Sequence, residues 1–390
     1  MMHSMRHLVE KLDAELDWQI LQDLASWTLD QALAIQRIPA PTFQERQRAE
    51  YVAQLFQQIG LQQVSIDSLH NVYGRLHGQE SRLSPVMISA HIDTIFAGDT
   101  DLSAKRDGEC ITGPGLGDNS IGVAGMIAIP YALQRMNVVP ERDLQIVATT
   151  REEGLGDLGG MRAAFQSMKH NIHCVINLEG LAFGHVYHAG IAVRRLHITA
   201  TAPGGHSWLH FGRSSAVHGI AQLAAKLTTI QPPQNPRTTY NIGMIEGGEA
   251  INAIATSASL WLDLRSEDRA TLEAIETQVR AHVTALTADD LTFSVRVVGD
   301  RPAGKLSPDH PLVQVAMAAL AQVGAHGTLE TGSTDANVPL SEGCPAITVG
   351  VTRGGNAHRL DEYVEIQPIA SGLRHLILLT LAASSSKEFR

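Results

Sequence analysis

The sequence has 390 residues, of which 44% are hydrophobic and 18% are charged, and its formal net charge is −10. A chain of this length exceeds one simple core, so we expect two domains with the composition of an ordinary globular protein. The acidic balance and the lack of a basic run argue against a nucleic-acid partner or an anionic membrane surface.

The cysteines and the N-terminal segment indicate the cellular compartment in which we expect the protein. Three cysteines, Cys110, Cys174 and Cys344, show no CxxC spacing, so we expect neither a disulfide framework nor a cysteine-based zinc site. The first residues interleave charges with apolar side chains and lack the apolar core of a signal peptide. No segment approaches the roughly 18 consecutive apolar residues of a membrane span. We therefore expect a protein of the reducing cytoplasm.

The N-terminal part of the chain is expected to be helical. Residues 8–36 have helical spacing without Pro or Gly, and a proline-bearing turn follows. Thr42 resembles an N-cap, and Glu45 completes a capping box before a helix that runs to about Gln58.

Apolar, strand-like runs then alternate with helical patterns. The expected strands are Val86–Ala90, Leu144–Thr150, Cys174–Leu178 and Ala346–Val351, and the expected helices are Ser120–Gln134, Gly160–Ser167, Pro311–Val323 and the apolar C-terminal Leu373–Ala383. Near-continuous apolar strands between helices predict an α/β fold with a mostly parallel sheet covered on both faces.

The middle of the chain has a different order. We expect strand, helix, strand, strand, helix and strand at Val193–Ala200, Ser214–Ile230, Thr239–Glu246, Ser257–Arg265, Ala270–Leu286 and Leu291–Val298. This β-α-β-β-α-β order is typical of a ferredoxin-like α+β unit. We therefore predict a catalytic domain in two parts, residues 1–192 and 301–390, with a second domain inserted at residues 193–300.

Five residues of metal-ligand type follow strand-like runs or stand in glycine-rich turns. They are His91 in SAHID, Asp118 in GLGDN, Glu153 in TTREEG, Glu179 in INLEG and His358 in GGNAH. Each is weak evidence alone, but open α/β sheets place their chemistry at the carboxyl ends of strands. Two imidazoles and three carboxylates can hold two divalent cations if one carboxylate bridges them. The joint occurrence predicts a two-metal hydrolase.

Other interpretations of these motifs fit less well. The glycines before Asp118 could cradle a phosphate, but the spacing is not GxGxxG and the aspartate would repel an anion. Asp118 could also cap the helix that follows it. GGHSW and TGSTD lack the GxSxG spacing of a serine hydrolase. Glu152 lies next to Glu153, and because neighbouring side chains diverge, it could act as a general base while Glu153 binds a cation.

Together the motifs resemble those of the M20 family of co-catalytic zinc peptidases and deacylases. That family includes peptidase T, carboxypeptidase G2, acetylornithine deacetylase and succinyl-diaminopimelate desuccinylase. The resemblance runs from about Ile38 to Ile366 and rests on SAHID, GLGDNSIG, TREEGLGDLGG, NLEG, GGHSW, NAIA, LDLRSED, TGSTDAN and GGNAH. GGHSW followed by FGRSSAVH is most similar to the peptidase T-like branch. In the family the inserted domain is a lid and often a dimerisation module, so the resemblance implies a homodimer.

The resemblance also implies a metal site. Asp118 would bridge two divalent ions of zinc type, with cobalt or manganese as alternatives. His91 and Glu179 would complete one site, and Glu153 and His358 would complete the other.

Further roles follow from the same resemblance. Glu152 would be the general base, and Asp93 would orient the imidazole of the preceding ligand. In the inserted domain, His206 would stabilise the oxyanion, and Asn252 and Arg265 would bind a substrate carboxylate.

These motifs lead to one main expectation and two alternatives. We expect an amide hydrolase acting on small substrates, most simply a di- or tripeptide exopeptidase such as an aminopeptidase of the peptidase T type. A deacylase of N-acyl amino acids would use the same catalytic residues. A non-catalytic metal- or peptide-binding homologue would lack Glu152 or a ligand, and this chain lacks neither.

Overall fold

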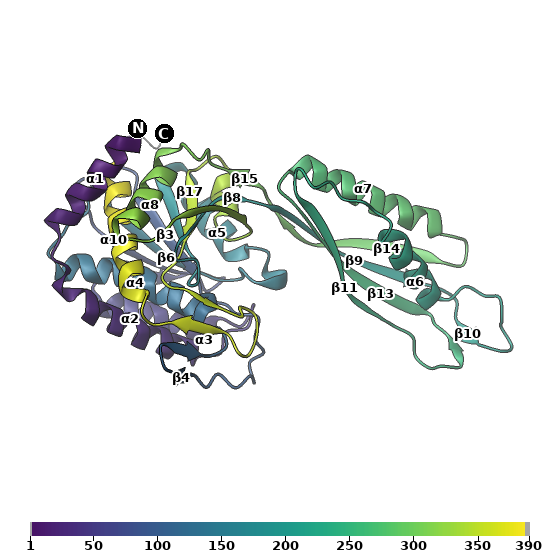
Figure 1. The fold of residues 1–390 in the computed structure, drawn as a ribbon. Helices are drawn as coiled ribbons and strands as arrows, with labels where there is room; N and C mark the ends of the chain where they lie inside the picture. Colours follow the sequence, from purple (N-terminus) through teal and green to yellow (C-terminus); the bar gives the residue numbers. More distant parts are fainter. Residues whose placement is uncertain (1, 387–390) are drawn as a thin grey trace. The chain divides into compact units, whose positions relative to one another are not determined.

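The computed structural model describes residues 2–386, and these form two compact units (Figure 1). Unit 1 comprises Met1–Gly190 and Gly304–Arg390, and unit 2 comprises Ile191–Ala303. The outer limits of the predicted catalytic domain, residue 1 and residues 387–390, lie outside the described residues. Nowhere in residues 2–386 is there a helix long and apolar enough to cross a membrane.

Among the described residues, unit 1 is built on a nine-stranded sheet in the order β1-β2-β6-β3-β7-β17-β8-β15, with β16 pairing β8. The four central strands, β6, β3, β7 and β17, pair in parallel, as the apolar runs predict. The pairs β1-β2, β2-β6, β17-β8 and β15-β8 are antiparallel. The strands are β1 Gln62–Ile66, β2 Val72–Leu76, β3 Val86–His91, β6 Leu144–Thr149, β7 Cys174–Leu178, β8 His185–Gly190, β15 Gly304–Lys305, β16 Thr328–Gly332 and β17 Ala346–Val349.

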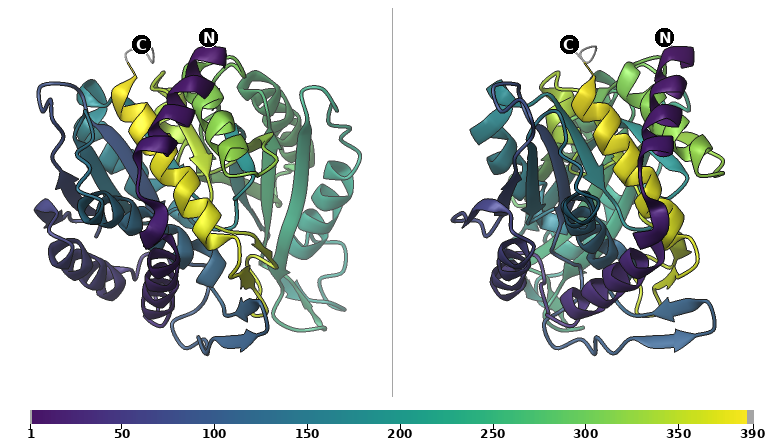
Figure 2. Two further views of the ribbon diagram at one scale, coloured as in Figure 1. Left: turned by 60° about the vertical axis from the view of Figure 1, so that its left-hand side comes forward. Right: turned by 90° about the vertical axis from the view of Figure 1, so that its left-hand side faces the viewer.

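Both faces of this sheet are covered by helices, which is why its central strands are apolar throughout. Ile88 packs into a core shared with most of the helices, whereas its neighbour Met87 packs on the opposite face with α5 (Gly159–Met168) and α9 (Asn337–Ser341). Figure 2 shows α1 and α10, which contact each other, side by side on the first face. The helices of that face are α1 Met2–Glu15, α2 Leu21–Gln36, α3 Arg46–Gln58, α4 Ile121–Arg135, α8 Pro311–Gln322 and α10 Ile369–Ser385.

The N-terminal helices differ from the sequence prediction in two ways. The helical run of residues 8–36 is broken by a 3₁₀ turn at Trp18–Ile20, because the Asp17 carboxylate accepts the backbone N–H of Gln19 at 3.0 Å and competes with the helix. The predicted capping box is wrong. The Thr42 hydroxyl donates to Asp93 at 2.8 Å instead, and the Glu45 carboxylate accepts from the Phe43 backbone at 2.8 Å. Helix α3 therefore begins at Arg46.

A small second sheet in unit 1 joins two segments that are distant in sequence. Its strand order is β18-β19-β5-β4, and none of these short strands was predicted. The strands are β4 Lys105–Asp107, β5 Cys110–Thr112, β18 Gly354–Gly355 and β19 Tyr363–Glu365. The turn after β5 and the turn between β18 and β19 are therefore held next to each other.

Unit 2 has the predicted ferredoxin-like arrangement. Its four long strands form an antiparallel sheet in the order β11-β13-β9-β14. Alternate residues of β13 are buried against the two helices, as in a sheet covered on one face. The elements are β9 Ala192–Thr201, α6 Ala216–Leu227, β11 Thr238–Gly247, β13 Ser257–Ser266, α7 Arg269–Leu286 and β14 Thr292–Arg301, with a short pair of β10 Gly205–His206 and β12 Ala253–Ile254.

Candidate metal centre

Three neighbouring parallel strands carry acidic and imidazole side chains at their carboxyl ends. His91 is the last residue of β3, Glu152 and Glu153 follow β6, and Glu179 follows β7. Because β6, β3 and β7 are adjacent and parallel, these residues lie at one edge of the sheet.

The other two predicted ligands come from turns held by the small sheet. Asp118 lies between β5 and α4, and its peptide bond to Asn119 is cis. His358 lies between β18 and β19 with a φ of 68°. Its Nε2 is 3.0 Å from Asp118 Oδ2 and 3.0 Å from Glu153 Oε1.

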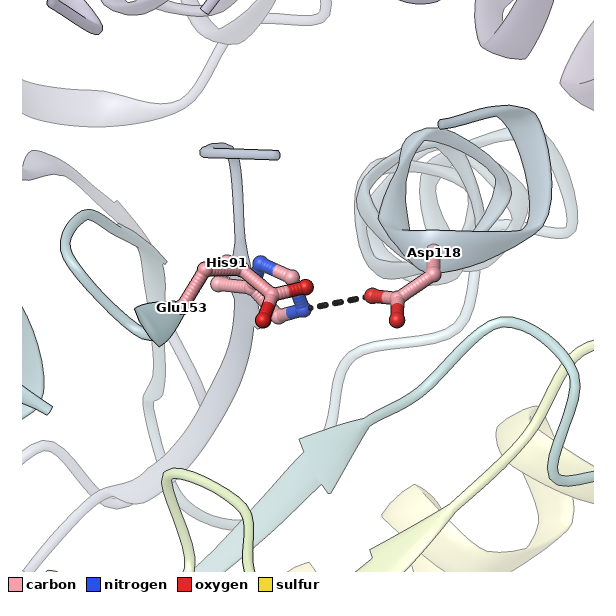
Figure 3. A group of neighbouring side chains, drawn as sticks. All are labelled: His91, Asp118 and Glu153. Carbon is pink, nitrogen blue, oxygen red and sulfur yellow. Dashed lines mark ion pairs between the residues drawn. The ribbon is translucent and has the colours of Figure 1, made fainter. Parts of the chain in front are cut away.

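The structure brings all five predicted ligand residues together around Asp118. His91 Nε2 lies 3.0 Å from Asp118 Oδ1 and 3.4 Å from Glu179 Oε2. The ligand atoms of His91, Asp118 and Glu153 all lie within 4.8 Å of one another. Figure 3 shows the polar ends of these three side chains gathered, with the contact between His91 and Asp118 dashed. Each oxygen of Asp118 thus faces a different imidazole.

The donor set fits a divalent cation. Within the described part of the chain, the buried Oδ1 atom of Asp118 has no hydrogen-bond partner, although it lies 3.0 Å from His91 Nε2. A buried carboxylate oxygen without a partner is unfavourable unless a cation neutralises it. Carboxylates and imidazoles are the usual ligands of zinc and of related divalent ions.

The carboxylates and imidazoles of the cluster shift one another's pKa values. Burial raises the pKa of Glu179 to about 7, and the charge of Asp118 adds to this effect. Burial opposes the protonation of His91, but the carboxylates around it outweigh burial and raise its pKa well above the usual value. Contacts with Asp118 and Glu153 raise the pKa of His358 to about 10. The carboxylates therefore favour positive charge at this site, which a divalent cation would supply in place of the protons.

Asp93 links His91, at the end of β3, to Glu152 and Glu153, which follow β6. Its Oδ1 accepts the backbone N–H of Glu152 at 2.9 Å, and its Oδ2 accepts that of Glu153 at 3.0 Å. Its backbone carbonyl lies 3.1 Å from His91 Nδ1, and its Oδ1 lies 3.6 Å from the same atom. Asp93 is fully buried and Glu152 is 6% exposed. One carboxylate therefore holds the Glu152–Glu153 backbone beside His91.

Two residues of this region have a left-handed backbone conformation although they are not glycine. Arg151, directly before Glu152, has a φ of 57°, and His358 has a φ of 68°. Such left-handed conformations in residues other than glycine cost on the order of 1–3 kcal/mol each and cluster at functional sites.

Sequence reasoning missed three buried polar residues that support the site. Asn119 accepts the Gly180 N–H at 2.8 Å and donates to the Leu178 carbonyl at 2.8 Å, so it holds the segment that carries Glu179. Its place directly after Asp118 was the available signal.

The other two residues, Asp335 and Glu362, have no neighbouring sequence feature that would indicate their role. Asp335 lies in TGSTDAN, one of the motifs of the family resemblance, but no role was predicted for this residue, which accepts the Thr149 hydroxyl at 2.5 Å. Burial and the charge of Glu152 raise the pKa of Asp335 to about 8. Glu362 accepts the backbone N–H groups of Gly117 and Asp118, which precede it by 245 and 244 residues.

The three remaining predicted residues lie in unit 2. His206 is exposed on β10, its Nδ1 accepts the Trp208 N–H at 3.2 Å, and the Ser207 N–H donates to the Asn252 carbonyl at 3.0 Å. Arg265 lies on β13, and its Nε donates to Asp263 at 2.7 Å. His206 and Asn252 are therefore neighbours, whereas Arg265 is already engaged by a carboxylate.

Comparisons with known proteins agree with this architecture. The sequence matches the model of the Peptidase family M20/M25/M40 over residues 87–382. It is 26% identical over 343 residues to the succinyl-diaminopimelate desuccinylase of Corynebacterium glutamicum, covering 85% of this chain and 90% of that protein. The aminopeptidase PepT of Bacillus cereus has a similar structure, with a TM-score of 0.74, 19% identity and coverage of 93% of this chain and 99% of that chain. A di-peptidase of Saccharomyces cerevisiae has a TM-score of 0.79 at 13% identity, with 100% of both chains covered.

Proposed function

The chain belongs to the peptidase family M20/M25/M40, a family of metal-dependent hydrolases of amide bonds, and from this premise we propose that it is a two-metal di- or tripeptide exopeptidase of the peptidase T type. His91 and Glu179 would hold one ion, Glu153 and His358 would hold the other, and Asp118 would be shared between the two sites. Zinc is the proposed metal, with cobalt or manganese as alternatives.

One observation carries the two-metal proposal. The two oxygens of Asp118 each lie 3.0 Å from a different imidazole, that of His91 and that of His358. Each imidazole is also close to a second carboxylate, Glu179 at 3.4 Å and Glu153 at 3.0 Å. Two such half-sites that share one carboxylate are what a pair of bridged cations requires.

The residues of the chain divide the chemistry between them. Divalent cations held by such ligands polarise an amide carbonyl and activate a water molecule. Glu152 takes a proton from the attacking water and delivers it to the amine nitrogen as the C–N bond breaks. The Asp93 carboxylate accepts the backbone N–H of Glu152 at 2.9 Å, so the proposed base is held at the end of β6.

We propose that unit 1 carries the catalytic residues and that unit 2 contributes to substrate binding. Unit 2 serves as a lid and a dimerisation domain, in which His206 stabilises the oxyanion and Asn252 and Arg265 bind the substrate carboxylate. Because Arg265 is paired with Asp263, carboxylate binding requires the guanidinium to use its remaining N–H groups.

A second candidate is an N-acyl-amino-acid deacylase of the desuccinylase type. The similarity to the desuccinylase of Corynebacterium glutamicum, which spans 85% of this chain, favours this candidate. The motifs GGHSW and FGRSSAVH favour the exopeptidase. Both enzymes would use the same ligands and the same base, so the substrate decides between them.

A matched substrate panel tests the proposal. Leucine carrying an N-terminal glycyl, acetyl or succinyl group presents the same leaving amine with three acyl groups. We expect the zinc-loaded protein to have its highest kcat/KM on the glycyl compound, measured as release of leucine. A preference for the succinyl or acetyl compound would support the deacylase. No release from any of the three, nor from a wider set of di- and tripeptides, would contradict the exopeptidase.

A further inference from the structure

Glu362 is a fully buried carboxylate between two ligand-bearing turns. It follows the turn of His358 and directly precedes β19. Its Oε1 accepts the Gly117 N–H at 2.5 Å and the Asp118 N–H at 2.9 Å. The carboxylate is therefore bound to the backbone of the turn that carries Asp118, from the chain segment that carries His358.

The backbone of Glu362 also forms hydrogen bonds, through both its N–H and its carbonyl group. Its N–H donates to the Arg359 carbonyl at 3.1 Å, which closes the turn that contains His358. Its carbonyl accepts the Gly113 N–H at 2.8 Å, which ties it to the start of the other turn. Glu362 is thus a connection between both turns.

This connection controls a distance on which the proposed centre depends. Asp118 Oδ2 and His358 Nε2 are 3.0 Å apart, and both are proposed to bind metal. Glu362 itself lies outside the group of ligand atoms formed by His91, Asp118 and Glu153. Residues that orient ligands in this way commonly change metal affinity by about 10- to 100-fold when altered.

A role only in folding would not require this residue type. A buried carboxylate without a cationic partner is unfavourable, and among the described residues Glu362 Oε2 has no hydrogen-bond partner. The hydrogen bonds that compensate for burial are directed at the peptide groups of Gly117 and Asp118. The contacts that hold Glu362 are therefore those that place a proposed ligand.

We propose that Glu362 is a positioning residue of the metal centre, which sets the placement of Asp118 relative to His358 through its hydrogen bonds to the Gly117–Asp118 backbone. The inference rests on the proposed two-metal function and adds a residue outside the ligand set. According to this inference, metal binding depends on the length of the Glu362 side chain and not on its charge.

Two substitutions separate reach from charge. Glu362→Asp keeps the charge but shortens the side chain by one methylene group, so the carboxylate cannot reach the two N–H groups. Glu362→Gln keeps the length and a carbonyl oxygen that can accept both hydrogen bonds, but removes the charge. Asp361→Asn is the matched control, because Asp361 is an exposed carboxylate in the same turn that pairs with Arg359.

The readout is metal binding by the full-length protein after chelator treatment. Zn²⁺ affinity is measured by competition with a chromophoric chelator, and the visible spectrum of the Co²⁺-loaded protein reports ligand geometry. We expect Glu362→Asp to bind Zn²⁺ about 10- to 100-fold more weakly and to change the Co²⁺ spectrum. Glu362→Gln and Asp361→Asn should remain close to the wild-type protein in both measurements.

Each other outcome has a defined meaning. Wild-type affinity in Glu362→Asp, or a loss in Glu362→Gln as large as that in Glu362→Asp, would overturn the positioning role. If Glu362→Asp does not fold by circular dichroism, Glu362→Gln still decides, because weakened binding there contradicts the inference and retained binding supports it. If the wild-type protein itself binds no Zn²⁺ or Co²⁺, the proposed function fails, and this is distinguishable because no variant is needed to see it.

Discussion

The Asp93 carboxylate accepts the backbone N–H of Glu152 at 2.9 Å through one oxygen, while its other oxygen accepts that of Glu153 at 3.0 Å. Both oxygens of Asp93 accept hydrogen bonds from backbone N–H groups. In an Asp93→Asn variant, the side-chain NH₂ group would have to face one of these N–H donors, and that hydrogen bond would be lost. We expect Asp93→Asn to lower the free energy of unfolding by about 1–3 kcal/mol and to reduce kcat more than it raises KM.

Asp143 provides the control for this variant. It is also fully buried and accepts a backbone N–H, that of Gly78 at 2.7 Å, but it directly precedes β6 and so lies at the opposite end of this strand from Glu152 and Glu153. Asp143→Asn should be destabilised in urea unfolding to a similar degree while kcat stays unchanged. If both variants lose stability and neither loses kcat, Asp93 has no role in catalysis.

Glu152→Gln tests the general base. The substitution preserves shape but removes the group that accepts the proton, so kcat should fall by about 10²- to 10⁴-fold. Metal content, measured by atomic emission after gel filtration, should equal that of the wild-type protein because Glu152 is not a proposed ligand. Substantial turnover by the variant would assign the base to another residue.

Removal of metal should affect both activity and stability. The carboxylates of Asp118, Glu153 and Glu179 lie close together, and without cations they repel one another. Dialysis against a chelator should abolish hydrolysis and lower Tm, and Zn²⁺, Co²⁺ or Mn²⁺ should restore both. A ligand at about 100 times its Kd stabilises a fold by roughly 2.7 kcal/mol. Full activity after exhaustive chelation would argue against metal dependence.

His375 predicts how stability depends on pH. Its ring is buried in α10, and burial lowers its pKa to about 4, an effect that the backbone of Ala316 partly offsets. Between pH 6.5 and 4 the unfolded chain binds a proton that the folded chain excludes, so stability is present above this window and falls as pH decreases. The loss should approach roughly 3 kcal/mol.

The His375→Leu variant should show a flatter dependence of unfolding free energy on pH within this window. His326→Gln, which changes an exposed histidine, should follow the wild-type curve. An unchanged slope in His375→Leu would mean that other groups cause the acid sensitivity.

Apolar patterning predicted the central strands and the ferredoxin-like unit because burial on one or both faces leaves a clear period in the sequence. It failed where polar side chains had non-local partners. Thr42 looked like a helix cap, but its hydroxyl is bonded to Asp93, 51 residues away. The short strands β4, β5, β18 and β19 contain three residues or fewer, too few to show a period.

The five proposed ligand residues were accessible because strand ends and glycine-rich turns mark them in the sequence, and the structure brings them together. Their supporting residues were not accessible, because Glu362 and Asp335 act through partners far along the chain. Thr149 and Asp335, for example, are separated by 186 residues. Nothing within a few positions of either residue indicates that contact.

The residues of the candidate metal centre are synthesised at widely separated times during translation. Glu153 and His358 meet at 3.0 Å although 205 residues separate them, and all of unit 2 is synthesised in the interval. Chains grow from the N-terminus, and their domains fold as they emerge. A nascent chain that has made β3, β6 and β7 but not yet residue 358 lacks one imidazole and the Glu362 connection, so hydrolytic activity should begin only after Glu362 has been added and the small sheet has formed.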